Sequence, residues 1–297
     1  MKKYFVFIVV AFMSCTVPMP AIVIQTDYGT KDGAVAEMKG VILSVDPSLQ
    51  VFDITHEIPQ YNIWEAAYRL NQAAPYWPKG TVFVSVVDPG VGTERKSVVL
   101  KTKTGHYFVS PDNGTLTLVA KNLGIDEIRE IDETKNRRKG SAGSNTFHGR
   151  DVYAYTAARL ASNTIPFDEV GKKLDKKVAS INYQDAVLSN GVISGNIPVL
   201  DIQYGNIWTN IPDSLITKAG WKYGKDLSIE IFNKDSSVYK DHVKLEKTFG
   251  SVPEGASLAY FNSLMNFSLA INMGSFSDKY KVYSGPQWSI KISAFKN

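Results

Sequence analysis

The sequence has little of what marks a disulfide-rich, metal-binding or nucleic-acid-binding protein. Cys15 is the only cysteine among 297 residues, so no intrachain disulfide is available. The four histidines are His56, His106, His148 and His242, and they show no paired ligand spacing, so we expect no metal site. A formal charge of +4 is too small to predict a nucleic-acid or anionic-membrane partner. The composition is that of a folded, soluble protein.

Glycine motifs for common cofactors are also missing. Gly29 and Gly33 do not form Gly-x-Gly-x-x-Gly, which argues against a nicotinamide cofactor. The chain has no Gly-x-Ser-x-Gly elbow and no phosphate-binding glycine loop.

Residues 1–20 differ from the rest. Lys2 and Lys3 precede an apolar run, 4–13, whose ten residues are too few for a bilayer span of about 20. This order is typical of an export signal, and Cys15 at its end resembles the lipid-modified first residue of a bacterial lipoprotein. A signal cut before Ala21 without lipidation, or a buried N-terminal strand, stays open. The segment predicts an exported protein, periplasmic or membrane-anchored through Cys15.

From residue 21 onward, short β-rich runs alternate with helical periods. This alternation predicts an α/β domain over 21–182, with a mostly parallel sheet flanked by helices. The polar stretch 133–145 predicts a mobile loop. The strands expected are 21–25, 51–54, 81–87, 97–101 and 107–110, the last two forming a hairpin, and the helices expected are 32–45, 63–74, 116–123 and 151–161.

The pattern changes after about residue 182. Strand-like runs there are separated by Gly, Pro, Asn and Ser, with no helical period between them. They predict an all-β, barrel-like C-terminal domain over 190–297. The strands expected are 191–200, 227–232, 238–246, 257–262, 267–272 and 288–294.

Three short segments place polar side chains next to strands or helices of the first domain. Asp88 follows an apolar strand and opens a Pro-Gly turn that leads to Arg95, and Asp27 follows the first strand. Ligands bind beyond the carboxyl ends of strands in such sheets, and a short carboxylate there suits a ribose diol. His148 precedes a helix, whose N-terminus favours a neutral imidazole. Ordinary turn, helix-cap and structural roles for these residues stay open.

The segment 201–210 of the second domain combines an acid, aromatic residues and amides, which we interpret as one loop. Aromatic faces stack on purines, and amides read a base edge. A core aromatic stripe is the alternative.

Together these segments resemble the S-adenosyl-L-methionine (SAM) hydroxide adenosyltransferases, or SAM hydrolases, which are related to fluorinases and chlorinases. The resemblance covers about residues 21–294. It rests on Thr26-Asp27-Tyr28-Gly29, Asp88-Pro89-Gly90-Val91-Gly92-Thr93-x-Arg95, Pro111-Asp112-Asn113-Gly114, Thr146-Phe147-His148-Gly149-Arg150-Asp151 and Tyr204-Gly205-Asn206-Ile207-Trp208-Thr209-Asn210.

The resemblance implies a reaction, an assembly and a role for each site residue. Water would displace methionine from the ribose C5′ of SAM to give adenosine, without metal or cofactor. The protein would be a homotrimer, with each site shared between the N-terminal domain of one subunit and the C-terminal domain of its neighbour. Its family counterparts assign water activation to Asp88, Arg95 and His148, ribose contact to Asp27, packing near the substrate to Tyr61, methionine contacts to Asp201 and Ser263, and adenine contacts to Tyr204, Asn206 and the backbone near Met273.

Two other functions compete with hydrolysis. Halide-using relatives lack the acid and the histidine, and a serine is expected in them where this chain has Gly149. Leu264 and Ile271 stand where those relatives carry arginines. A nucleoside- or SAM-binding lipoprotein without activity could dispense with Asp88 or His148. The presence of both residues favours hydrolysis.

Overall fold

The computed structural model describes residues 21–295, and its N-terminal part is a seven-stranded sheet in the order β2-β1-β3-β5-β4-β6-β7. Pairings from β2 to β5 are parallel, whereas those from β5 to β7 are antiparallel. The prediction of a mostly parallel sheet is therefore wrong for one half, because short links join antiparallel strands and parallel pairs need a long crossover. The strands are β1 (Ile22–Thr26), β2 (Val51–Thr55), β3 (Val82–Val86), β4 (Ser97–Thr102), β5 (Tyr107–Pro111), β6 (Ile125–Glu130) and β7 (Lys173–Leu174).

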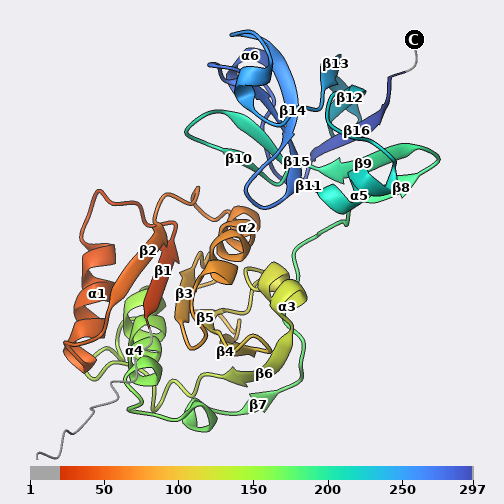
Figure 1. The fold of residues 1–297 in the computed structure, drawn as a ribbon. Coiled ribbons are helices and arrows are strands. Elements are labelled where there is room, and N and C mark those ends of the chain that lie inside the picture. The colour runs from red at the N-terminus through yellow and green to blue at the C-terminus, as the bar shows by residue number, and fades with distance from the viewer. Residues whose placement is uncertain (1–20, 296–297) are drawn as a thin grey trace, which may run out of the picture.

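Helices cover both faces of this sheet (Figure 1). Successive strand residues point to opposite faces. Accordingly, Ile22 and Ile24 of β1 pack with α1 and α4, while Val23 packs with α2 and α3. The helices are α1 (Ala34–Val45), α2 (Ile63–Ala73), α3 (Thr117–Leu123) and α4 (Tyr155–Ala161), with 3-10 turns at Ala74–Tyr76 and Phe167–Glu169.

Two features near α4 differ from the sequence prediction. The helix expected over 151–161 begins as a π-helical turn, Gly149–Ala154, before α4. The loop over 133–145 has no helix or strand, as predicted, but it packs against the domain. Asn136 is fully buried and donates to the Val170 carbonyl at 2.8 Å. The loop is thus anchored beside the helix that follows His148.

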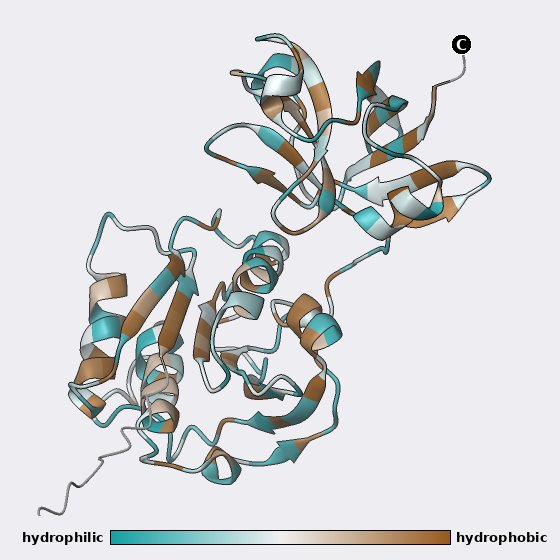
Figure 2. Cartoon of the chain, in the orientation of Figure 1, coloured by the Kyte–Doolittle hydropathy of each residue, from teal (hydrophilic) through white to brown (hydrophobic). Residues whose placement is uncertain are grey.

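The C-terminal part contains two antiparallel sheets, ordered β10-β11-β15-β14 and β13-β12-β16-β9-β8. Figure 2 shows hydrophobic residues alternating along these strands, and they enclose a separate core. The strands are β8 (Val187–Ser189), β9 (Val192–Asn196), β10 (Val199–Asp201), β11 (Asn206–Pro212), β12 (Asp226–Asn233), β13 (Ser236–Lys244), β14 (Ser257–Phe261), β15 (Asn266–Ile271) and β16 (Trp288–Ala294).

Several elements were missed by the sequence prediction. Two short helices, α5 (Asp213–Lys218) and α6 (Phe276–Tyr280), interrupt the β-rich part, as does the 3-10 turn Phe249–Ser251. Half of the expected 201–210 loop is strand β11, because its alternate residues Ile207, Thr209 and Ile211 enter the core. Strand β6 was also missed, since its sequence is mostly polar.

The two parts touch through α2. Trp64 Nε1 donates to the Pro198 carbonyl at 3.1 Å, and Arg69 Nη2 donates to the Leu200 carbonyl at 2.9 Å. Within residues 21–295, no helix has the length and apolar character to cross a membrane.

Candidate active site

The ends of two neighbouring parallel strands bring Asp27 and Asp88 together. Thr26 of β1 is paired with Val86 of β3, so the residues that follow emerge at the same edge of the sheet. Both carboxylates line a cavity of about 240 Å³. Its walls are Asp27, Tyr28, Gln60, Tyr61, Asp88, Val91, Thr146 and Gly149.

Asp88 is held by a two-pronged ion pair with Arg95. Arg95 Nε lies 2.9 Å from Asp88 Oδ1, and Nη2 lies 2.6 Å from Oδ2. The two side chains are only 11% and 5% exposed, respectively, so water screens the pair little. Burial is the largest single influence and opposes the charge of Arg95, but hydrogen bonding to Asp88 and the neighbouring acidic groups together outweigh it and raise the pKa of Arg95. The turn therefore presents a fixed carboxylate to the cavity.

The turn between these two residues is fixed by Gly92. Its φ of +77° is accessible to glycine, and a Cβ there would lie 2.8 Å from the Asn145 carbonyl oxygen. Gly92 thus lets the turn pack against the loop that precedes His148.

His148 completes the group predicted to activate water. Its Nδ1 lies 2.8 Å from Arg95 Nη2, and the residue is 5% exposed. Burial lowers the pKa of His148, and the cations Arg95 and Arg137 lower it further, against the opposing carboxylates Glu133 and Asp88. His148 does not line the 240 Å³ cavity, so it contacts Arg95 from behind Asp88.

The wall opposite Asp88 is formed around Tyr61. The Tyr61 backbone N–H donates to Asp27 Oδ2 at 2.9 Å, which orients one of the two carboxylates. Tyr61 itself has φ of 65°, an uncommon conformation for a residue with a side chain, and it is 68% exposed. Its ring is therefore available to a ligand.

Gly149 lies directly against Tyr28. A Cβ at Gly149 would overlap the Tyr28 hydroxyl, and the Tyr28 ring packs edge-on against Phe147 at 5.6 Å between centroids. Burial, followed by the nearby Asp27 and Asp88, raises the pKa of Tyr28, so its hydroxyl stays protonated. A serine at position 149 would have to displace this tyrosine.

The site residues predicted in the C-terminal part form a separate cavity of about 620 Å³. Asp201, Tyr204, Asn206 and Met273 line it, and Asn206 Nδ2 donates to Asp201 Oδ2 at 3.2 Å. Tyr204 and Met273 are 67% and 83% exposed, respectively. Ser263 lies apart from both groups, beside Ile202 and Tyr76 in a third cavity. Within the described part of one chain, the structure does not bring the two predicted halves of the site together.

Four polar residues of the site were not found from sequence. Tyr28 lines the cavity, and Tyr153 Oη lies 3.5 Å from Asp88 Oδ2. From the polar loop, Arg137 contacts His148 and Glu133 pairs with Arg137. The charges in the loop sequence were the available signal for the last two, but their spacing gives no sign of the contact.

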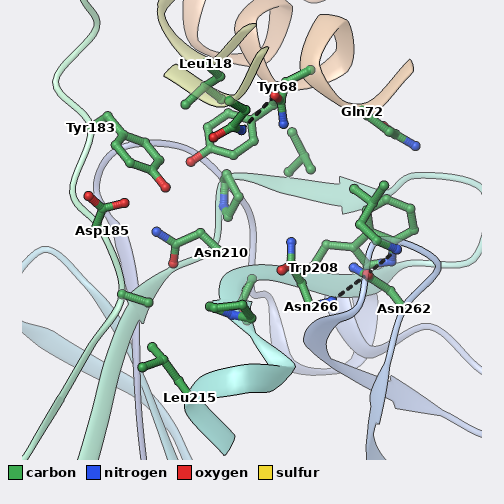
Figure 3. Close-up of a pocket in the computed structure, with 18 of the residues that line it drawn as sticks. Tyr68, Gln72, Leu118, Tyr183, Asp185, Trp208, Asn210, Leu215, Asn262 and Asn266 are labelled. Atoms are coloured by element: carbon green, nitrogen blue, oxygen red, sulfur yellow. Dashed lines mark hydrogen bonds between the residues drawn. The ribbon is translucent and has the colours of Figure 1, made fainter. Parts of the chain in front are cut away.

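A further cavity of about 420 Å³ lies between α2 and α3 and the C-terminal strands (Figure 3). It contains none of the predicted site residues, and its carboxylate, Asp185, is paired with Lys121. We therefore place the chemistry at Asp88 instead. Among residues 21–295, no cluster of three or more His, Cys, Asp or Glu side chains is arranged to hold a metal ion.

Comparison with known proteins identifies the family of the chain. Residues 22–171 match the SAM hydroxide adenosyltransferase N-terminal domain, and residues 195–289 match the C-terminal domain. The chain is 38% identical over 259 residues to the (R)-S-adenosyl-L-methionine hydrolase of Methanocaldococcus jannaschii, covering 86% of each protein. It is 30% identical over 298 residues to the fluorinase of Actinopolyspora mzabensis, covering 92% of this chain and 97% of that protein.

A solved structure supports the same assignment. The crystal structure of a conserved protein from Thermotoga maritima has a TM-score of 0.85 and 36% identity, covering 92% of this chain and 99% of that one. The matched segments include Asp27, Asp88, Arg95 and His148 in the first domain and Asp201 and Asn206 in the second. The chain therefore belongs to the SAM hydroxide adenosyltransferase family.

Proposed function

We propose that this protein hydrolyses SAM to adenosine and L-methionine by attack of water at the ribose C5′. The observation that carries the proposal is the bonded series Asp88–Arg95–His148 beside a cavity that also contains Asp27. Relatives named as SAM hydrolases, at 33–38% identity, support the same reaction.

The chemistry follows from the leaving group. A sulfonium carries a positive charge that is neutralised when its bond to C5′ breaks, so methionine departs without help from a metal or a redox cofactor. The oxygen of water forms the new bond to C5′, the electron pair of the broken bond goes to sulfur, and one proton of the water is released. Water is a weak nucleophile and gains from a fixed, proton-accepting neighbour in line with the departing sulfur.

Asp88 is placed to orient that water. Its carboxylate lines the cavity, and Arg95 holds both of its oxygens in one orientation. Asp27, fixed by the Tyr61 backbone, has the geometry to accept hydrogen bonds from the ribose hydroxyls. No bound cofactor is required by this scheme.

Halide transfer is the competing reaction, because a fluorinase is among the relatives. The negative charge of Asp88 repels an anion in the cavity, and Gly149 supplies no serine hydroxyl, since atoms added there would overlap Tyr28. Both features favour water over halide. A binding protein without activity would have no need for the buried Arg95 pair.

A complete site requires two copies of the chain in this proposal. The 240 Å³ cavity carries the reactive groups, the 620 Å³ cavity carries Tyr204, Asn206 and Met273, and no residue lines both. We propose a homotrimer in which each N-terminal cavity faces a neighbour's C-terminal cavity. Closed symmetric assembly is the usual way in which identical chains share sites.

Export and lipidation through Cys15 also remain proposals, because residues 1–20 lie outside the described structure. Fractionation of cells tests them. A processed protein in the envelope fraction supports export, whereas an unprocessed chain in the cytosol contradicts it.

The function is tested with the chain from residue 21 onward, SAM and water enriched in heavy oxygen, with and without chloride. Mass spectrometry of the nucleoside should show adenosine with one heavy oxygen atom in both conditions. A halogenated nucleoside would assign the chain to the halide-using branch. Binding without turnover would indicate a receptor.

A further inference from the structure

The His148 ring is enclosed by two guanidinium groups. Arg95 Nη2 lies 2.8 Å from Nδ1, and Arg137 Nη2 lies 3.0 Å from Nε2 on the other side of the ring. Arg137 is 15% exposed and is itself held by Glu133, whose Oε2 lies 2.6 Å from the same Nη2 atom. The resulting order is Asp88, Arg95, His148, Arg137 and Glu133, with a carboxylate at each end.

The number of hydrogen-bond acceptors on the ring limits which protonation state of His148 is compatible with the two arginines. A guanidinium only donates hydrogen bonds, whereas a neutral imidazole has one accepting nitrogen and one N–H. A neutral ring therefore satisfies one of the two arginines, and an imidazolium satisfies neither and adds a third positive charge. The arrangement disfavours protonation of His148 on both sides.

Arg95 holds Asp88, whereas Arg137 has no role in the proposed reaction so far. It does not line the 240 Å³ cavity, and its remaining hydrogen bond, from Nη1 to the Ser144 carbonyl at 3.2 Å, ties it to the loop before His148. Arg137 therefore reaches the reaction only through the imidazole.

We propose that Arg137, held by Glu133, is a positioning residue that keeps His148 neutral, so that no third positive charge repels Arg95 and Arg95 stays on Asp88. The consequence is that His148 does not store the proton released by water. This inference rests on the proposed hydrolysis for its kinetic consequences, but not for the charge state of the ring.

The groups that face the imidazole come from three elements. Arg95 and Asp88 belong to the turn after β3, and Glu133 and Arg137 belong to the polar loop. Tyr153, from the π-helical turn, faces Asp88 and donates or accepts a hydrogen bond with Ser97 at 3.2 Å. Burial lowers the pKa of His148 most, Glu133 opposes it next, and Arg95 and Arg137 then lower the pKa further, with Asp88 as the smallest opposing charge.

Substitutions of Arg137 and of Glu133 should therefore shift the pKa of His148 in opposite directions. Arg137→Met removes a cation, so the pKa of His148 should rise, and the acid limb of the kcat profile should move to higher pH. Glu133→Gln removes an anion, so the pKa should fall, and the limb should move to lower pH. At neutral pH, Arg137→Met should reduce kcat by about tenfold to a hundredfold, with KM for SAM within about twofold.

The charge state is measured without substrate by NMR titration of histidines labelled at Cε1, in the chain from residue 21 onward. The His148 signal is the one that disappears in His148→Gln. Arg137→Lys keeps the positive charge and should keep the His148 titration near that of the wild type. Arg159→Met is the matched control, because Arg159 anchors the same loop through the Lys135 carbonyl and Asn136 Oδ1 without contacting the ring.

An unchanged His148 titration in Arg137→Met, or shifts of the same sign in Arg137→Met and Glu133→Gln, would overturn the proposal. If Arg137→Met does not fold, Arg137→Lys and Glu133→Gln still decide it. A wild type that fails to cleave SAM while its His148 titration responds as expected would reject the proposed function and leave the charge inference standing.

Discussion

The two cavities are built in different ways. The N-terminal cavity sits where parallel strands end, and its charged groups are buried, paired and hydrogen-bonded to one another, as with Asp88 and Arg95. The C-terminal cavity is lined by exposed side chains such as Tyr204 and Met273. Buried pairs hold their geometry before a ligand arrives, whereas exposed aromatic and thioether groups gain contacts only when something covers them. We infer that the first cavity supplies chemistry and the second supplies recognition.

The largest effect on activity is expected from substitutions at the N-terminal cavity. Asp88→Asn keeps the shape of the carboxylate but removes its charge, so kcat should fall by about 10²- to 10⁴-fold while SAM still binds. Adenosine release and isothermal calorimetry measure the two quantities. His148→Ala should show the same split, because the Arg95 contact is lost. Wild-type turnover in either variant would reject the water-activation assignment.

Charge reversal at Asp201 tests whether the C-terminal cavity binds the substrate. Asp201→Lys places a cation where the positively charged methionine end of SAM is expected, so binding should weaken by about a hundredfold or more. The N-terminal cavity is untouched, so kcat at saturating SAM should stay near that of the wild type. A change confined to kcat would contradict the division of roles.

Mixing a chain impaired in chemistry with a chain impaired in binding tests whether the cavities work across subunits. Co-expression of Asp88→Asn and Asp201→Lys chains should restore activity, because about a quarter of randomly assembled interfaces pair one intact cavity of each kind. The control is co-expression of either variant with itself. No recovery, despite co-purification of the two chains, would place the whole site within one chain.

A smaller effect is expected at Gly149. Gly149→Ser adds atoms that overlap the Tyr28 hydroxyl, and overpacking of this kind costs about 1–3 kcal/mol. Thermal unfolding and kcat/KM should both fall, and no chloride-dependent product should appear. Tyr28→Phe combined with Gly149→Ser should recover part of the stability. Full activity in Gly149→Ser alone would show that Tyr28 is not fixed.

The smallest effect concerns the link between the two parts. Lys121 pairs with Asp185, but the side chains are 42% and 68% exposed, respectively. Exposed pairs contribute about 0–1 kcal/mol, so Lys121→Met should leave the free energy of unfolding, measured with denaturant, within that range. A larger loss would mean that this pair matters more to domain docking than the buried contacts of Trp64 and Arg69.

Much of the fold follows from local pattern. Alternating apolar residues predicted β1, β3, β12 and β16 to within about two residues, and the helical period placed α1 and α2. The pattern failed where tertiary contacts decide. The polar residues of β6 form a strand because they pair with the edge of β4 that β5 leaves open. Residues Gly149–Ala154 form a π-helical turn beside Tyr28.

The sequence by itself determined which reactive residues the chain has and that Asp27 and Asp88 follow apolar strands, because hydrophobic periodicity and turn chemistry are local properties. Only the tertiary structure decided that β1 and β3 are parallel neighbours, that Arg137 reaches His148, and that the two cavities lie apart. Contacts between distant segments depend on strand order and packing, and the spacing of residues along the chain determines neither.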